Sequence, residues 1–163
     1  MADPLQYTAA VVTVSDSRSR GDQEDESGPA LVRALEGLHF SVMQRKVVPD
    51  DQIQIQNLLI QLSCEVQFVV TTGGTGIAPR DVTPEATVAV CDRLLDGIAE
   101  RMRTEGLKKT PFAALSRGVC GVRGCALILN VPGSPNGAVD SLQAVAGLLP
   151  HAIDLLNGKT EHQ

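Results

Sequence analysis

The segment Val66–Glu85 reads VQFVVTTGGTGIAPRDVTPE, and its character changes twice along its length. An apolar run rich in β-branched residues leads into six residues that contain three glycines and three threonines. Glycines leave backbone N–H groups free to turn toward an anion. Arg80 and Asp81 add a cation and a carboxylate, and Thr83-Pro84 supplies an N-cap and a first helical residue. The segment therefore predicts a buried strand, a phosphate-handling loop and a helix, in that order.

Other parts of the chain repeat the strand-and-loop pattern. The runs Tyr7–Val14 and Ala126–Val131 resemble Val66–Thr71 in composition, which is typical of strands buried on both faces. Phe40–Val48 is a fourth candidate with a more alternating pattern. This rhythm of strand, loop and helix predicts an α/β fold, a doubly wound and mostly parallel sheet with helices on both faces. With no repeat or long linker, residues 1–163 are expected to form a single domain.

Apolar residues at helical spacing follow the predicted strands. The expected helices carry the stripes Leu31, Leu35 and Leu38; Ile55, Leu58, Leu59 and Leu62; and Ala138, Leu142, Val145 and Leu149. In a parallel sheet the strands end at the same edge, and ligands bind outside that edge. Three loops are therefore expected to meet there: Ser15–Arg18, Gly73–Gly76 and Pro132–Pro135.

The composition argues against several classes of protein. Aromatic residues make up 2% of the chain and Trp is absent, so a surface that stacks single-stranded nucleic acid is not expected. The net charge of −5 without a basic run argues against nucleic acid and anionic membranes as partners. No apolar run approaches ~20 residues and no basic targeting region opens the chain, so we expect a soluble, cytoplasmic protein. Lys108-Lys109 and Glu100 are expected to face solvent.

The cysteines carry no metal-binding signature. They are Cys64, Cys91, Cys120 and Cys125, and neither their spacing nor a nearby histidine suggests zinc. We expect all of them to be buried free thiols, as suits a reducing compartment.

Two carboxylates have both a structural and a functional interpretation. Asp81, near a helix start, would favour the helix dipole by ~0.3–1 kcal/mol. Because Thr83 is better placed as the N-cap, Asp81 is left free to hold Mg²⁺, which takes one or two carboxylates plus substrate phosphates. The pattern around Asp50 favours an N-cap for the helix that contains Ile55, although Asp51 could serve equally.

Further polar residues are open between two roles. Ser15–Ser17 could form a turn or line a site. Arg117 and Arg123 could each fork onto a phosphate, although pairing with a surface acid is the commoner fate of an arginine. Asn130 and Ser134 could line a pocket, or they could only cap and turn; Ser134 is a good N-cap because Pro135 fits the next position.

Taken in order, the motifs of the chain resemble the molybdopterin adenylyltransferases of the MogA/MoaB type, which include the N-terminal domain of gephyrin. The motifs run from about Tyr7 to Gly158, which is the expected core of the domain. They are Thr13–Ser17 with Ser27–Pro29, Val48–Asp51, Thr72–Thr87, Thr110–Phe112 with Leu115–Arg117, and Leu129–Pro135. Within them, Arg80–Glu85 is similar to the adenylylating branch of the family, whereas Val131 stands where Asn or Met is typical.

The resemblance implies an α/β fold, usually a trimer, that acts in molybdenum cofactor biosynthesis. Such enzymes transfer AMP from Mg-ATP to the terminal phosphate of molybdopterin and release pyrophosphate. Asp50 and Asp81 match the acids assigned to Mg²⁺ and catalysis, which reverses the N-cap interpretation of Asp50. The candidate ligand-binding residues, from the resemblance and the arguments above, are Ser15, Asp16, Ser17, Thr72, Gly73, Gly74, Thr75, Gly76, Arg80, Ser116, Arg117, Pro132, Gly133 and Ser134.

The expected partners are molybdopterin and ATP, with Mg²⁺ as cofactor, and a homotrimer is implied by the resemblance alone. The sequence carries no recognisable molybdenum-inserting domain, so hand-over to a separate insertion protein is expected. A rival hypothesis is a non-catalytic molybdopterin-binding or scaffolding module. A plainer one is a generic doubly wound nucleotide binder. It is weakened because the loop lacks the Walker A lysine and the third glycine of the dinucleotide fingerprint.

Overall fold

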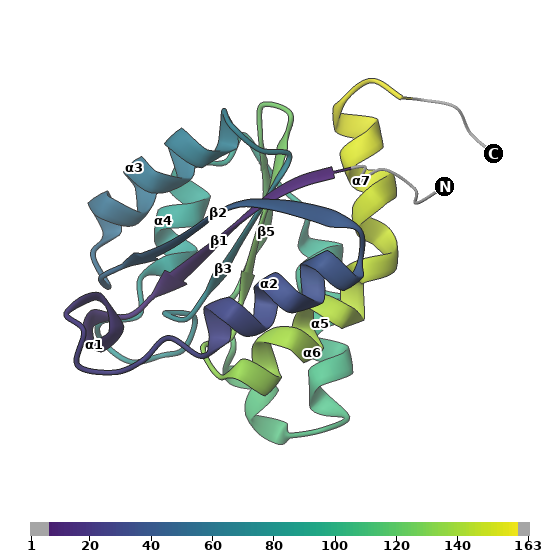
Figure 1. Cartoon of the computed structure of the whole chain (residues 1–163). Coiled ribbons are helices and arrows are strands. Elements are labelled where there is room, and N and C mark those ends of the chain that lie inside the picture. The colour runs from purple at the N-terminus through teal and green to yellow at the C-terminus, as the bar shows by residue number, and fades with distance from the viewer. Residues whose placement is uncertain (1–6, 160–163) are drawn as a thin grey trace.

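The strand before the glycine-rich loop, β3 (Phe68–Thr72), lies in the interior of the sheet in the computed structural model, which describes residues 7–159. It pairs in parallel with β1 (Tyr7–Val14) on one side and with β6 (Ala126–Val131) on the other. β2 (Phe40–Val48) pairs in parallel with the far side of β1. The strand order is β2-β1-β3-β6-β5-β4, which confirms the predicted mostly parallel sheet (Figure 1).

Two short strands that the sequence pattern did not predict complete the sheet. β5 (Cys120–Arg123) pairs antiparallel with β6, and β4 (Arg93–Leu94) pairs antiparallel with β5. β4 has two residues and β5 has four, so neither exceeds the shortest runs, of about 4 residues, from which strands are usually identified. Long-range pairing with β6, rather than local composition, creates them.

Helices cover both faces of the sheet, as predicted (Figure 1). α3 and α4 pack on one face, and α2, α5, α6 and α7 pack on the other. The helical elements are α1 (Asp16–Ser19), α2 (Ser27–Gly37), α3 (Gln52–Ser63), α4 (Thr83–Val90), α5 (Asp96–Leu107), the 3-10 helix η1 (Pro111–Leu115), α6 (Pro135–Val145), the 3-10 helix η2 (Ala146–Leu148) and α7 (Leu149–Leu156). No helix within residues 7–159 combines the length and the apolar composition that crossing a membrane requires.

The last predicted helical stripe, from Ala138 to Leu149, is divided between two helices. α6 ends at Val145, and α7 begins at Leu149 after a short 3-10 turn. Pro150 explains the break, because a proline lacks the N–H for an intrahelical bond and its ring clashes with the carbonyl four residues earlier. Both helices still place their apolar residues in the same core.

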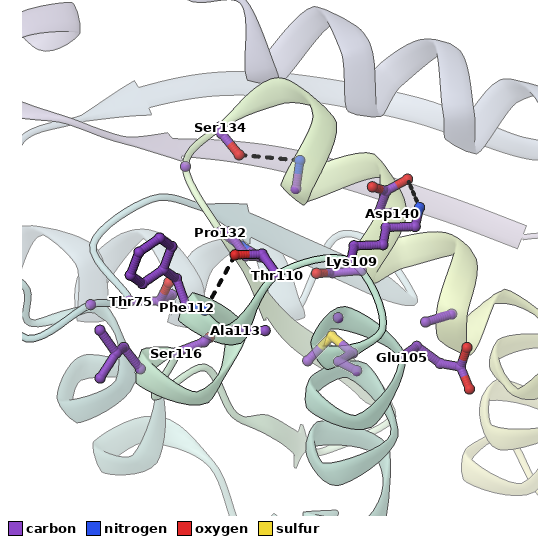
Figure 2. Close-up of a pocket in the computed structure, with 18 of the residues that line it drawn as sticks. Thr75, Glu105, Lys109, Thr110, Phe112, Ala113, Ser116, Pro132, Ser134 and Asp140 are labelled. Carbon is purple, nitrogen blue, oxygen red and sulfur yellow. Dashed lines mark hydrogen bonds and ion pairs between the residues drawn. The ribbon is translucent and has the colours of Figure 1, made fainter.

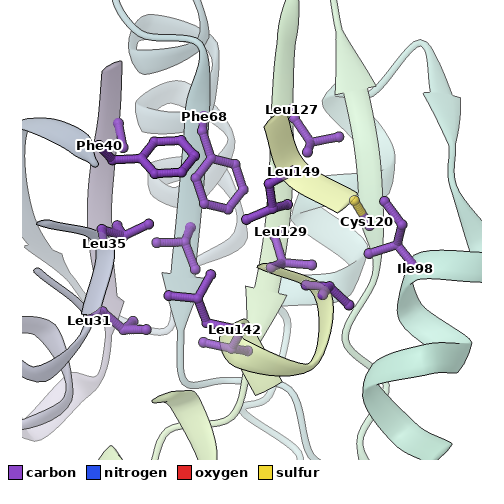
Figure 3. Packing of buried hydrophobic residues seen from close by; sticks show 14 of the residues in the cluster. Leu31, Leu35, Phe40, Phe68, Ile98, Cys120, Leu127, Leu129, Leu142 and Leu149 are labelled. Carbon is purple, nitrogen blue, oxygen red and sulfur yellow. The ribbon is translucent and has the colours of Figure 1, made fainter. Parts of the chain in front are cut away.

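The core is built from aliphatic residues on both sides of the sheet. On the face covered by α2 and α6, fully buried Leu31, Leu127 and Leu142 belong to the same cluster as Phe40 and Phe68, whose rings are tilted by 49° to each other (Figure 3). The opposite face has its own cluster of valines, leucines and isoleucines under α3 and α4. The central strands are thus buried on both faces, as their apolar runs predicted.

All four cysteines are free, but the expectation that all are buried is wrong. Only Cys120, on β5, is buried. Cys91 is half-buried, whereas Cys64 at the end of α3 and Cys125 in the turn before β6 are exposed. Burial raises the pKa of the Cys120 thiol to about 12 and that of Cys91 to about 11, so neither is a ready nucleophile.

Candidate functional site

The glycine-rich loop lies where the sheet reverses its winding, because β2 flanks β1 on one side and β3 flanks it on the other. Such a switch point leaves a crevice at the carboxyl ends of the strands. Gly73 has a φ of +99°, and a side chain there would overlap the carbonyl oxygen of Val14 at the end of β1. A Cβ on Gly133 would lie 3.2 Å from the Cα of Gly73. The loops after β1, β3 and β6 therefore meet, as predicted. Their close approach requires glycine at position 73 and favours it at position 133, where a side chain would crowd the backbone of Gly73.

Gly74 brings the loop against α4 and a carboxylate. It has a φ of +67°, and an added Cβ would overlap the hydroxyl of Thr83 and lie 3.1 Å from Oδ1 of Asp50. In the same way, a Cβ on Gly76 would lie 2.9 Å from Oδ2 of Asp81. The two predicted acids therefore flank the glycine-rich loop from separate segments of the chain.

Thr83 does not cap α4, and that part of the prediction is wrong. The N-cap position is Val82, and Thr83 is the first residue of the helix. The Thr83 hydroxyl is fully buried and donates to the carbonyl of Gly73 at 3.0 Å. Thr72 has a similar role, since its buried hydroxyl donates to the carbonyl of Pro132 at 2.7 Å. Both threonines hold the loops together because the buried loop carbonyls need donors.

Arg117 holds the other side of the loop. Its Nε donates to the carbonyl of Gly76 at 2.8 Å, and its Nη2 donates to the carbonyl of Asp81 at 2.9 Å. It also pairs with Glu85, and this guanidinium lowers the pKa of the Glu85 carboxyl. Of the two roles left open for Arg117, phosphate binding or pairing with an acid, the structure shows the pairing with Glu85. Its other N–H groups donate to the backbone carbonyls of Gly76 and Asp81. Arg123 likewise donates to the carbonyl of Val90 at 2.8 Å.

A cavity of about 750 Å³ opens beside this loop (Figure 2). Residues of α5, η1 and α6 line it together with part of the predicted site. The predicted residues in its lining are Gly73, Gly74, Thr75, Gly76, Asp81, Ser116, Pro132, Gly133 and Ser134. Ser134 also caps α6, accepting a hydrogen bond from the N–H of Gly137 at 3.1 Å, so both of its possible roles are compatible with its position.

Asp16, Asp50 and Arg80 form a network beside the cavity rather than in its lining. The N–H of each aspartate donates to the carboxylate of the other at 3.0 Å. The Nε and Nη2 of Arg80 donate to the two carboxylate oxygens of Asp16 at 2.7 and 3.0 Å. Nη2 also donates to the carbonyl of Asp50 at 3.0 Å. Asp51, not Asp50, caps α3 by accepting from the N–H of Gln54 at 2.9 Å. The side chain of Asp50 is therefore not used as a helix cap.

The network shifts the pKa values of the two aspartates in opposite directions. The Arg80 guanidinium lowers the pKa of the Asp16 carboxyl. Burial raises the pKa of Asp50, and the nearby charges of Asp16 and Asp81 raise it further. Carboxylates whose pKa values are pushed apart by their surroundings are common at functional sites.

The serines of the first loop are engaged within the loop. Ser15 is the N-cap of α1, and its Oγ accepts from the N–H of Arg18 at 3.3 Å. Ser17 lies 3.2 Å from Ser15 between hydroxyl oxygens, and it donates to Gln23 at 3.1 Å. Neither serine lines the cavity, so the turn interpretation describes their present contacts.

Asn130 takes neither of the roles left open for it. It is fully buried, and its amide nitrogen donates to the hydroxyls of Thr71 and Thr87, at 2.9 Å each. Its amide oxygen accepts from the N–H of Val119 at 3.2 Å. Asn130 thus ties β6 to β3, α4 and the segment before β5, beneath the loops rather than in the cavity.

Several residues on the far wall of the cavity were missed. Lys109 pairs with Asp140 of α6 at 2.9 Å and Lys108 pairs with Glu105 at 2.9 Å, and all four line the cavity. The lysines are exposed, as expected, but their position beside a cavity was not foreseen. Phe112 of η1 also lines it. Phe112 belongs to the Thr110–Phe112 motif of the resemblance, which gave it no role, and the scarcity of aromatic residues was a second signal that could have singled it out.

The donor set suits a magnesium ion. Asp50 accepts a backbone N–H with Oδ2, and Asp81 accepts that of Ala78 with Oδ2 at 3.0 Å. Among the described residues, the Oδ1 atoms of both have no hydrogen-bond donor. No group of three or more His, Cys, Asp or Glu side chains in residues 7–159 could form a metal cage. A pair of carboxylates is nonetheless what Mg²⁺ uses when substrate phosphates supply the remaining oxygens.

Comparisons with known proteins agree with this arrangement. The molybdopterin adenylyltransferase of Helicobacter pylori is 41% identical over 152 residues, covering 91% of this chain and 86% of that protein. The enzyme of the same name from Escherichia coli K12 is 38% identical over 164 residues, covering 91% and 84%. The molybdenum cofactor synthesis protein cinnamon of Drosophila melanogaster is 42% identical over 153 residues, but the chain spans only 25% of its length.

Solved structures give the same result. MoaB of Thermus thermophilus superposes with a TM-score of 0.89 at 48% identity, covering 94% of this chain and 98% of that one. The tungsten cofactor synthesizing protein MoaB of Pyrococcus furiosus gives 0.84 at 31%, covering 98% and 100%. A family model described as a probable molybdopterin binding domain matches residues 10–151. With its fold, its cavity at the sheet edge and these relatives in agreement, the chain belongs to the family of probable molybdopterin binding domains.

Proposed function

We propose that this protein is a molybdopterin adenylyltransferase of molybdenum cofactor biosynthesis. The observation that carries the proposal is near-full-length similarity to two enzymes of that name, at 41% and 38% identity over 91% of the chain. The cavity at the switch point supports it, because the glycine-rich loop and the carboxylate residue Asp81 both line it. In the reaction, an oxygen of the terminal phosphate of molybdopterin bonds to the α-phosphorus of ATP. The bond from that phosphorus to the bridging oxygen breaks, and pyrophosphate leaves.

The residues of the site would act by positioning and charge, as phosphoryl-transfer sites generally do. The N–H of Gly73 donates to the carbonyl of Val131 at 3.2 Å, so the backbone N–H groups of Gly74–Gly76 are the ones proposed to hold phosphate oxygens. Ser116 and Ser134 are proposed as hydroxyl contacts on the same cavity. Asp50 and Asp81 are proposed to hold Mg²⁺, which when bound neutralises phosphate charge. Asp16 and Arg80 are proposed to keep Asp50 in place.

The reaction is tested by incubating the purified protein with molybdopterin, ATP and Mg²⁺. Adenylyl-molybdopterin and pyrophosphate are expected only when all three are present. If molybdopterin binds and no pyrophosphate is released, the scaffolding hypothesis is correct instead.

The role of Asp81 is tested by Asp81→Asn. Turnover is expected to be abolished, because the amide cannot replace an anionic metal ligand, while molybdopterin binding is largely retained. Product formation and pterin affinity are measured on the same preparation. Equal loss of both would argue against a metal role for this residue.

We extend the proposal to a homotrimer in the cytoplasm that passes its product to a separate molybdenum-insertion protein. The support is the membership of the chain in its family. Light scattering on the purified protein tests the assembly, and a mass other than three chains would contradict it.

A further inference from the structure

Phe112 is the one aromatic side chain within residues 7–159 that the core does not use. The chain has three Phe, one Tyr and no Trp. Tyr7, Phe40 and Phe68 pack together, with successive ring centroids 5.6 Å apart, and each is buried. Phe112 instead is 74% exposed and lines the large cavity. Figure 2 shows its ring standing on the side of the cavity where Thr75 and Ser116 lie.

The backbone beneath Phe112 is held in place. Phe112 is the second residue of η1, and its N–H donates to the Thr110 hydroxyl that caps this 3-10 helix, at 3.3 Å. Pro111 restricts the first residue. A Cβ on Gly106 of α5 would lie 2.9 Å from the Cβ of Ala113, so η1 packs closely on α5. The ring is therefore presented at a defined place rather than on a freely moving loop.

The surroundings of Phe112 suit a ligand with a flat ring at one end and an anionic group at the other. Ala113 and Leu115 continue the apolar wall beside it. Gly73–Gly76 of the glycine-rich loop line the same cavity. The Lys109–Asp140 ion pair stands away from the ring in Figure 2 and leaves this wall uncharged. Aromatic side chains bind flat rings by stacking on their faces, with little regard to the ring's substituents.

We propose that Phe112 is a stacking platform for the planar heteroaromatic ring of a ligand bound in this cavity. The identity of that ring rests on the proposed function, which offers adenine from ATP and the pterin of molybdopterin. Another use for an exposed apolar side chain is contact with a second copy of the chain. Ile77 and Leu115, which are 68% and 49% exposed, would belong to such a contact.

Phe112→Trp provides a direct probe, because the chain contains no other tryptophan. The variant is titrated with AMP, with a simple pterin and, as a ligand without a ring system, with ribose 5-phosphate. Fluorescence quenching by AMP or by the pterin, but not by ribose 5-phosphate, is expected, and the effective ligand identifies the ring. Absence of quenching by both, at concentrations at which equilibrium dialysis shows them bound, would overturn the proposal.

Affinity measurements separate stacking from mere burial. Phe112→Ala is expected to weaken binding of the effective ring ligand by about 5-fold to 100-fold, the usual cost of losing a base–aromatic stack. Phe112→Tyr should bind as the wild type does, and Phe112→Leu should remain weak because it keeps apolar area without a ring face. Ile53→Ala is the matched control, since Ile53 is 63% exposed on α3 and lies outside the cavity.

The failure of this proposal is distinguishable from failure of the proposed function. If the wild type forms adenylyl-molybdopterin and Phe112→Ala leaves ring affinity unchanged, the platform is refuted and the enzyme stands. A change in oligomer mass with unchanged affinity would refute it in favour of a subunit contact. If no product forms but the Phe112 variants still lose ring affinity, the platform stands and the enzymatic function fails.

Discussion

Asp50 and Asp16 lie in neighbouring loops, but their carboxylates have different electrostatic surroundings. Asp16 receives a guanidinium, whereas Asp50 is partly buried beside two other carboxylates. In the folded state, ionisation is therefore less favourable for Asp50 than for Asp16. A metal ion would relieve that situation, because it supplies positive charge where the protein chain has placed carboxylates.

Asp50→Asn is expected to raise the melting temperature at neutral pH while reducing activity. The folded-state pKa of Asp50 is raised, so its ionisation weakens folding once the pH exceeds its ordinary value, and the amide removes this effect. The stabilisation should disappear below the ordinary aspartate pKa of about 3.9, where the wild-type carboxyl is protonated in both states. Thermal unfolding of both proteins at the two pH values, without metal, is the measurement. A variant less stable than wild type at neutral pH would contradict it.

Arg80→Ala is expected to lower kcat/KM with little change in melting temperature. Arg80 is exposed, and exposed ion pairs contribute little to stability, but its loss frees Asp16 and the carbonyl of Asp50. Because Arg80 lowers the pKa of Asp16, the acidic limb of the pH–rate profile should move to higher pH. Arg20→Ala is the control, since Arg20 is equally exposed and pairs with Asp22, and it acts on Asp16 only weakly, through its charge and without a side-chain hydrogen bond. Identical kinetic effects of the two variants would refute a positioning role for Arg80.

At the scale of elements, the glycine-rich loop depends on backbone contacts with β1, α4 and the loop after β6. Gly73 illustrates this, because its neighbours are the carbonyl oxygen of Val14 and the backbone of Gly133. Its own carbonyl accepts the Thr83 hydroxyl at 3.0 Å. A residue with a side chain would separate β1 from β3 at the point where the crevice begins.

Gly73→Ala is expected to destabilise the fold by more than Gly21→Ala. Both glycines have positive φ, of +99° and +81°, so both substitutions incur a left-handed backbone penalty of about 1–2 kcal/mol. Only Gly73 adds a steric overlap, since nothing lies within 4 Å of a Cβ on Gly21. Chemical denaturation gives the two free energies of unfolding, and product formation should fall for Gly73→Ala alone. Equal destabilisation would show that the close approach to Val14 relaxes easily.

Across the whole molecule, the parts of the site come from loops that are far apart in sequence and are joined beneath by buried polar contacts. Asn130 is the centre of these contacts, because one side chain bonds β3, α4 and the segment before β5. The hydroxyls of Thr71 and Thr87 are also fully buried. Buried polar groups of this kind are costly when a partner is removed.

Asn130→Ala is expected to lower the free energy of unfolding by about 2–4 kcal/mol, because it leaves buried donors and acceptors without partners. Asn157→Ala is the matched control, since Asn157 is exposed and its side chain donates once, to the carbonyl of Ile153 at 2.8 Å. That change should cost only about 0.5 kcal/mol. Denaturant unfolding of both variants measures the difference, and comparable losses would show that the Asn130 contacts are weak.

The predictions from sequence were most accurate where the pattern was long and local. The four parallel strands and the helices on both faces followed from apolar runs and helical spacing. The antiparallel strands β4 and β5 did not, because two and four residues carry too little pattern. The role of Thr83 was predicted wrongly because a threonine before a proline is the usual cap, whereas here a tertiary partner, the Gly73 carbonyl, takes its hydroxyl.

The sequence by itself determined the winding of the sheet and the edge at which the three loops meet, since those depend on periodicity, glycine and the parallel topology. Only the tertiary structure decided which polar side chains face the cavity and which hold the loops. It drew Asp16, Arg80 and Arg117 into contacts with neighbouring segments, and it brought Lys109 and Phe112 to the cavity wall. The physical reason is that a side chain's partner is chosen by through-space neighbours, which no local pattern encodes.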